Sequence, residues 1–183
     1  MTTLSTAAWV SHEMALAAGL GGSLFRQTTF PNALSKVSDD KQRAHLLARG
    51  YKKNAPFELS SLGIITGTWL VGRSMINGRF ISRGTRAMIY AKDALVAGAV
   101  LTGIAGVYFD RVLEDEADHG EIAVSGMHAT DASTPKAKKV FNAVQGISIA
   151  HMACLAGALG LTTVLAAQAN RSLKFSLLSR ILR

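Results

Sequence analysis

Apolar residues of this chain fall in four blocks, at about residues 5–25, 57–77, 89–109 and 144–168, and most charged residues lie between them. A helix of about 20 residues spans the roughly 30 Å hydrocarbon core of a bilayer. The last two blocks, around LVAGAVLTGIAGVYF and ISIAHMACLAGALGLTTVLAAQ, are apolar on every face, whereas a helix of a soluble bundle carries a polar stripe. The pattern therefore predicts an all-α fold: an integral membrane four-helix bundle in which residues 1–183 form a single membrane domain.

The connections between the blocks predict two amphipathic helices at the membrane surface. In the first connection, residues 26–56, Pro31 should end the first helix. A short surface helix should then end near Gly50, and Pro56 should open the second span. The C-terminal residues 170–183 carry leucines at helical spacing among Lys and Arg: Leu173, Leu177 and Leu178. Both segments are predicted to lie in the interface, with basic groups toward anionic headgroups.

Small residues recur every four positions in each block, and such stripes let helices pack closely in lipid. They are Ala15, Gly19 and Ser23; Gly63 and Gly67; Ala94, Gly98, Thr102 and Gly106; and Ala150, Cys154 and Ala158. The stripes predict a compact bundle, or a bundle that packs against further membrane subunits.

The N-terminal block is predicted to be an uncleaved helix rather than a signal peptide, because MTTLSTAAW has no Lys or Arg. Four spans put both termini and the second connection on one side of the membrane. The second connection and the tail are basic, while the third connection begins acidic. The positive-inside rule then favours termini on the cytoplasmic or matrix side of a bacterial inner or organellar inner membrane.

Charge, cysteine content and motifs limit the kinds of binding site and active site that the chain can form. The net charge of +8 comes without any nucleic-acid-binding motif, so the basic residues are assigned to lipid headgroups. The single cysteine, Cys154, excludes a disulfide and a thiolate metal cluster and is predicted to be a packing residue. His119 and His128 lie in the acidic third connection, where a solvated loop is favoured over a metal site. No Walker, GxSxG or HExxH motif is present.

Ionisable groups inside the blocks are the candidate functional residues, since burying charge in a membrane is costly. The alternating direction of four spans sorts them into two layers. On the terminus side lie His12, Glu13, Arg73, Lys92 and Asp93. On the opposite side lie Arg26, Glu58, Asp110, Arg111 and, about two turns into its block, His151. The first layer yields a candidate cluster of His12 with Glu13, Arg73 and Asp93, for which salt bridging is favoured over a ligand or proton-handling role.

Both membrane histidines are candidate cofactor ligands. His151 stands among apolar residues, where it is either a core residue bonded to a neighbouring helix or an axial ligand of haem. A quinone or pigment is a further option, and the sequence requires no cofactor. His12 and His151 should differ in depth by roughly 10 Å, from the rise per residue. That difference argues against one bis-histidine haem site.

The stretches ALAAGLGGSLFRQTTFPNAL and ARGYKKNAPFELSSLGIITG resemble the opening of small four-span membrane proteins of the anthrone-oxygenase-like family. The shared features are a glycine-rich first helix at 19–22, a following proline at Pro31, Tyr51 in an amphipathic stretch, and Pro56 at the start of the second span. The resemblance covers about the first 75 residues. It implies the four-helix topology and transfers no catalytic residue.

Two functions fit these observations. The first is a non-catalytic accessory or structural subunit of a larger membrane complex, such as an energy-transducing one. The second is a small membrane oxidoreductase, or a haem- or quinone-binding protein, that uses an intramembrane histidine. A transporter is disfavoured because the sequence lacks broken helices and an inverted repeat.

Overall fold

The computed structural model describes the backbone of residues 3–76 and 83–181, and side chains within residues 7–74 and 83–167. Four long helices make up most of it: α1 (Thr3–Leu24), α3 (Asp40–Ile76), α4 (Arg83–Asp118) and α5 (Pro135–Ile181). A π-helical turn, η1 (Phe25–Thr29), and the short α2 (Phe30–Leu34) follow α1. The strands β1 (Val124–Ser125) and β2 (His128–Ala129) form one antiparallel hairpin between α4 and α5. The predicted all-helical class is confirmed, with this hairpin as its only strand pair among the described residues.

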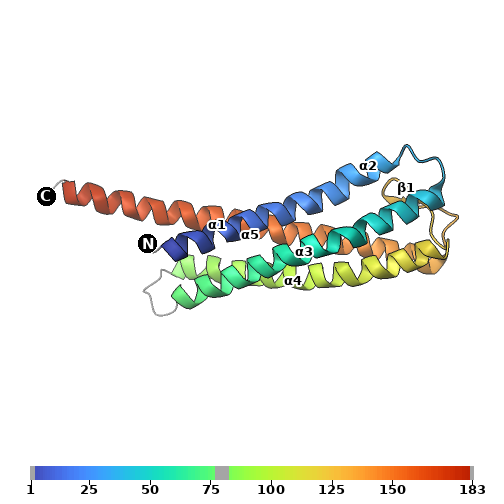
Figure 1. Ribbon diagram of the computed structural model, residues 1–183. Coiled ribbons are helices and arrows are strands. Elements are labelled where there is room, and N and C mark those ends of the chain that lie inside the picture. The colour runs from blue at the N-terminus through green and yellow to red at the C-terminus, as the bar shows by residue number, and fades with distance from the viewer. Residues whose placement is uncertain (1–2, 77–82, 182–183) are drawn as a thin grey trace.

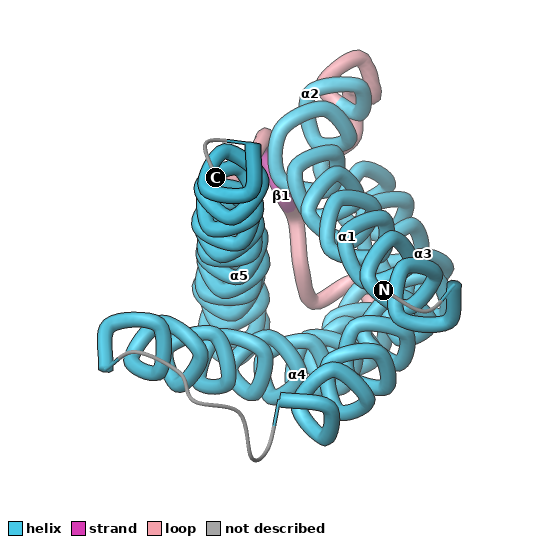
Figure 2. Tube along the Cα trace, turned by 90° about the vertical axis from the view of Figure 1, so that its left-hand side faces the viewer, coloured by secondary structure: helices cyan, strands magenta, loops and turns pink. Residues whose placement is uncertain are grey.

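The helices lie side by side in a closed ring, in the order α1, α3, α4, α5 (Figure 2). Figure 1 shows the start of α1, the end of α3 and the start of α4 at one end of the bundle, and α5 extends past that end. The hairpin and the link from α2 to α3 lie at the other end. This is the up-and-down arrangement that four alternating apolar blocks require.

Buried positions on α4 and α5 follow a seven-residue repeat. On α4 the two sets are Ile89, Val96, Gly103, Asp110 and Ala117, and Lys92, Ala99, Gly106 and Leu113. On α5 they are Ala137, Val144, His151 and Ala158, and Phe141, Ser148, Leu155 and Thr162. Such a repeat keeps one seam of a helix against its neighbours over many turns. Because Asp110 and His151 occupy seam positions, the packing of the helices forces these polar side chains into the core.

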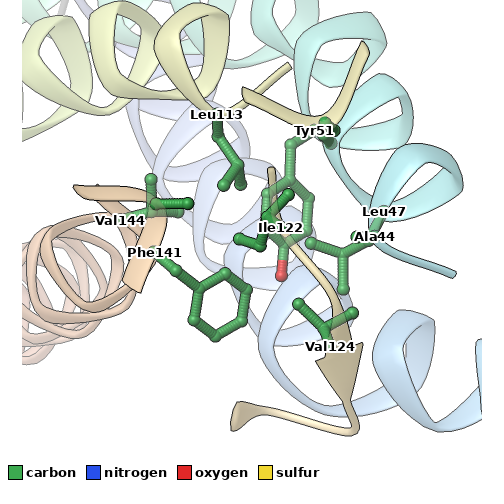
Figure 3. Packing of buried hydrophobic residues seen from close by; sticks show 11 residues of the cluster. Ala44, Leu47, Tyr51, Leu113, Ile122, Val124, Phe141 and Val144 are labelled. Atoms are coloured by element: carbon green, nitrogen blue, oxygen red, sulfur yellow. The ribbon is translucent and has the colours of Figure 1, made fainter. Parts of the chain in front are cut away.

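Two apolar cores succeed one another along the bundle. The core nearer the termini is built from Leu16, Leu62, Ile65 and Leu155 with their small neighbours. The second core lies at the hairpin end and is called the cap core here. Figure 3 shows how the hairpin strand and all three longest helices contribute to it: Ala44, Leu47, Tyr51, Leu113, Ile122, Val124, Phe141 and Val144.

The first connection differs from its prediction, because its second half is part of α3 rather than a separate surface helix. The helix runs unbroken from Asp40 to Ile76, through Gly50 and Pro56. Its apolar face does not lie on lipid; Ala44 and Leu47 are buried in the cap core. At Gly50 a Cβ would stand 2.3 Å from the ring of Phe30, so the glycine admits a close approach instead of ending the helix.

The C-terminal tail is likewise the continuation of α5, which is 47 residues long. Its predicted apolar face lies outside the described side chains, as do residues 77–82 of the second connection.

By length and composition, two helices of the described chain could cross a membrane: α4, and α5 from Pro135 to Ala167. Only 33% and 22% of their most apolar stretches are buried within the bundle. Most of this apolar surface therefore faces outward, which supports association with a membrane. The other two predicted spans, in α1 and α3, do not meet the same criterion.

Candidate functional site

A buried ion pair joins η1 to α4 between the two apolar cores. Arg26 Nη1 donates a hydrogen bond to Asp110 Oδ2 at 2.7 Å, and Nη2 donates to Oδ1 of the same carboxylate. Arg26 is 5% exposed, and Asp110 is not exposed at all. Parallel bonds from a guanidinium to a carboxylate are the strongest geometry for an ion pair. The pair therefore fixes the end of the first helix against α4.

Two side chains of α3 complete the surroundings of Arg26. The guanidinium lies 3.9 Å from the centre of the Tyr51 ring, a distance typical of a cation–π contact. The Tyr51 hydroxyl donates to the backbone carbonyl of Arg26 at 3.4 Å. Glu58, two helical turns further along α3, places Oε2 3.7 Å from Arg26 Nη1.

His151 on α5 reaches this cluster from the other side. Its Nε2 lies 3.5 Å from Glu58 Oε1. Its Nδ1 lies 3.0 Å from the carbonyl oxygen of Ala99 and 3.1 Å from Thr102 Oγ1, both on α4. Arg26, Glu58, Asp110 and His151 thus form one buried polar cluster, to which four elements each contribute one residue.

Helix geometry explains why these residues meet. On α1 the buried positions His12, Gly19 and Arg26 lie seven apart, and η1 carries the last of them. A π-helical turn shifts the phase of a helix and is frequent at functional positions. On α3, Tyr51, Glu58 and Ile65 are also spaced by seven, so one seam carries all three toward the bundle axis.

A small cavity adjoins His151. It has a volume of about 10 Å³ and is lined by residues of the cluster together with Ser23 and Ser148. The ring is also close to α4, since a Cβ on Gly103 would stand 3.2 Å from His151 Cε1. The imidazole is enclosed and both its nitrogens face protein groups, so the site as it stands has no room for a porphyrin.

The terminus-side layer is a second polar group, centred on Trp69 of α3. Asp93 accepts a hydrogen bond from Trp69 Nε1 at 2.7 Å and forms an ion pair with Arg73 at 3.0 Å. The ring of His12 stacks on Trp69 with centroids 5.8 Å apart. The structure therefore brings His12, Arg73 and Asp93 to one place through a tryptophan whose role in the site the sequence did not reveal.

Glu13 does not join that group. It lies near Lys92 and Thr162, on the side of α1 that faces α5. Lys92 is 2% exposed and places Nζ 4.5 Å from the centre of the Trp69 ring. The sequence neighbours His12 and Glu13 thus contact different helices.

One ring nitrogen of His12 has no partner among the side chains and backbone that the structure describes. Its Nδ1 lies 2.9 Å from Thr68 Oγ1 and 3.2 Å from the carbonyl oxygen of Ile65. Its Nε2 is buried and has no hydrogen-bond partner among the described residues. His12 and His151 contact α3 about two turns apart, through Ile65 and Glu58 respectively, so they do not face a common site.

The small residues expected to line the bundle interior do so on only some helices. Cys154 packs where a Cβ on Gly98 would stand, 2.9 Å from its Sγ, in a close helix contact. Gly63 and Gly67, in contrast, face outward, and a Cβ on either would meet nothing within 4 Å. With Met14, Ala18, Phe57 and Ile64 they line an apolar groove of about 660 Å³ between α1 and α3.

No group of three or more His, Cys, Asp or Glu side chains that could hold a metal occurs within the described residues. In comparisons with protein-family models, curated proteins and solved structures, the chain matches none. The function is therefore argued from the geometry of the bundle.

Proposed function

We propose that this protein is a four-span membrane protein that serves as a non-catalytic, structural subunit of a larger membrane assembly. The observation that carries the proposal is the outward groove between α1 and α3. Small residues at an exposed helix face allow another helix to approach closely, and close packing is the main attraction between helices in lipid. A transmembrane helix of another subunit fits a groove of this size and apolar lining.

The distribution of exposed apolar side chains supports four spans. Trp9 and Met14 on α1, Leu70 on α3, and Leu101 and Tyr108 on α4 are each at least half exposed. A soluble protein rarely exposes so large a contiguous apolar surface. Because α1 and α3 expose large apolar side chains as α4 does, all four helices share one environment in this proposal.

The polar groups of the interior support a structural role. The cluster around Arg26 is enclosed by contacts among its members and by the bonds of His151 to Ala99 and Thr102 of α4. The adjoining cavity of about 10 Å³ excludes a substrate larger than water. Buried ion pairs and hydrogen bonds between helices fix the register of those helices. This arrangement suits a scaffold better than an active site.

The groove can be tested without disturbing the bundle. Gly67→Leu adds a side chain to the groove, and the matched control Gly160→Leu adds one to open space on α5. In mild-detergent extracts of the native membrane, the wild type and Gly160→Leu should migrate with stoichiometric partners, and Gly67→Leu should lose them. A wild-type protein that migrates alone contradicts the proposal. If the co-migrating protein is a second copy, the groove is a self-association site instead.

One observation favours the alternative, a haem- or quinone-binding membrane oxidoreductase. The buried Nε2 of His12 has no partner among the described residues, and a buried nitrogen normally has one. A bound quinol hydroxyl or a haem iron would supply it. An absorption spectrum of the purified protein with a chromophore that His12→Gln removes would establish this alternative.

A further inference from the structure

The charges of the buried polar cluster do not cancel if each group keeps its usual form at neutral pH. Arg26 is always protonated, and its two hydrogen bonds to Asp110 use a carboxylate. That pair is neutral as a whole. Glu58 then adds a second negative charge to the same guanidinium, in a place where only 11% of its side chain is exposed.

An uncompensated charge in such a place is strongly unfavourable, because the protein interior solvates it far less well than water does. The other described ionisable groups near Glu58 are few: Arg26 from η1, Asp110 from α4 and His151 from α5. Of these, histidine is the residue type that most readily gains or loses a proton at physiological pH. The cluster becomes neutral when one proton resides on either Glu58 or His151.

The hydrogen bonds of His151 fix which nitrogen takes part. The carbonyl oxygen of Ala99 can only accept, so Nδ1 of His151 carries a hydrogen and donates to it. Thr102 Oγ1 already donates to the carbonyl of Gly98 at 2.6 Å, which leaves it as a second acceptor. Nε2 is therefore the nitrogen that gains or loses a proton, and it is the one that faces Glu58 at 3.5 Å.

We propose that Glu58 and His151 together form a binding site for one exchangeable proton. In one form a protonated Glu58 donates its O–H to the lone pair of Nε2; in the other an imidazolium donates Nε2–H to the carboxylate. The two forms differ only in the position of that proton, and both leave the cluster neutral. The site stands apart from the proposed subunit role and does not depend on it.

The cavity beside the pair offers room for a water molecule between the two groups that share the proton. It is lined by Glu58 and His151 together with the hydroxyl-bearing residues Ser23, Thr102 and Ser148. Its volume of about 10 Å³ is at the lower limit for a single water molecule, which needs two to four polar partners. A water there would bridge the carboxyl group and the imidazole, and the hydroxyls would orient it.

The test is spectroscopic and uses the full-length protein in lipid nanodiscs at neutral pH. If the proton resides on Glu58, infrared spectra should show a protonated-carboxyl stretch that disappears in Glu58→Gln. If it resides on His151, ¹⁵N NMR should show an imidazolium that becomes neutral in Glu58→Gln. In either case the signal should shift on transfer to D₂O. Glutamine copies the shape and charge of protonated glutamate, so this variant should fold.

Asp93→Asn, in the other polar layer, serves as the matched control and should leave both signals unchanged. The proposal is overturned if the wild type holds a carboxylate at Glu58 and a neutral imidazole at His151 together. It is equally overturned if the proton signal does not respond to D₂O. Neither measurement depends on a partner, so the subunit role can fail while this site stands.

Discussion

Arg26 and Asp110 are separated by 84 positions in the sequence, yet they form a bidentate ion pair at the centre of the bundle. The pair joins a π-helical turn to a seam position of α4. It lies between the core nearer the termini and the cap core, where four elements meet.

Removing one partner of the buried pair should be strongly destabilising. In Asp110→Ala the guanidinium of Arg26 remains buried without its carboxylate, which should cost about 3–5 kcal/mol. Chemical or thermal unfolding in one detergent measures the loss. The matched control is Asp93→Ala, whose carboxylate is 31% exposed in its pair with Arg73 and should cost at most about 1 kcal/mol for the ion pair. Equal losses at the two positions would contradict the burial argument.

A methyl group at Gly103 should disturb the contact between α3, α4 and α5. Its Cβ would stand 2.3 Å from Leu62 Cδ1. Overpacking of this kind costs about 1–3 kcal/mol, which should exceed the gain of about 1 kcal/mol in helix propensity.

Gly146→Ala on α5 is the control for this prediction, because its Cβ would meet nothing within 4 Å. It should be neutral or stabilising by up to about 1 kcal/mol. Leu62→Ala should cost less in the Gly103→Ala background than alone, since the smaller residue relieves the overlap. A Gly103→Ala protein as stable as the wild type would mean that Leu62 repacks freely.

The effect of a charge on the outer surface of α4 distinguishes a membrane-spanning bundle from a soluble one. Leu101 is 70% exposed and sits in the middle of the apolar part of the helix. Lysine near the centre of a membrane helix costs about 2.5–3.5 kcal/mol on insertion scales. Leu101→Lys should therefore reduce membrane insertion, measured by glycosylation mapping or protease protection.

Leu46→Lys is the matched control, because Leu46 is exposed on the charged part of α3 beside the cap core. It should insert as the wild type does. If Leu101→Lys and Leu46→Lys are both harmless, the apolar surface of α4 does not face lipid.

His119, just after the end of α4, should titrate at higher pH than a free imidazole. The backbone carbonyl of Asp115 accepts a hydrogen bond from its ring and raises the pKa, and the Asp115 carboxylate adds to this effect. A raised pKa means that the imidazolium stabilises the folded state below a pH of about 6.5, and that this contribution disappears as pH rises through the folded pKa.

NMR titration of His119 measures this shift directly. Asp115→Asn should lower the pKa of His119, because it removes the Asp115 charge, which is one of the causes of the raised pKa. The exposed Asp131→Asn should leave the pKa of His119 unchanged. A pKa in Asp115→Asn that is as high as in the wild type would show that the carboxylate does not contribute.

The apolar blocks predicted the helices well and their ends less well. Blocks of about 20 apolar residues are visible in any sequence, but α3 is 37 residues long. The stretch 41–53 has apolar residues on one face, and that pattern is the same whether the face lies on lipid or on a protein core. Ala44 and Leu47 face the cap core, and the hairpin residues that build it come from about 80 positions further along. The pattern of residues 41–53 alone therefore cannot show that the hairpin packs on this face.

The candidate site could be predicted in outline. The alternating direction of the four predicted spans placed Arg26, Glu58, Asp110 and His151 on the same side of the membrane. It could not show which of these side chains are in contact. The seven-residue spacing of Tyr51, Glu58 and Ile65 is a signal that would have selected the seam. The spacing-four stripes were a weaker guide, because Gly63, Gly67 and Ala94 face outward. Small residues favour close packing without saying whether the neighbour belongs to the same chain.

The unbroken course of α3 and α5 has a mechanical consequence. Each helix passes through both apolar cores, and at 1.5 Å per residue α3 is a rod of about 55 Å. A force applied at the hairpin end is therefore carried along the helix axes to the layer of Arg26 and Glu58, with no loop in between to absorb it. The distance between the carboxyl group of Glu58 and the imidazole of His151 therefore depends on how α3 and α5 are held at the hairpin end.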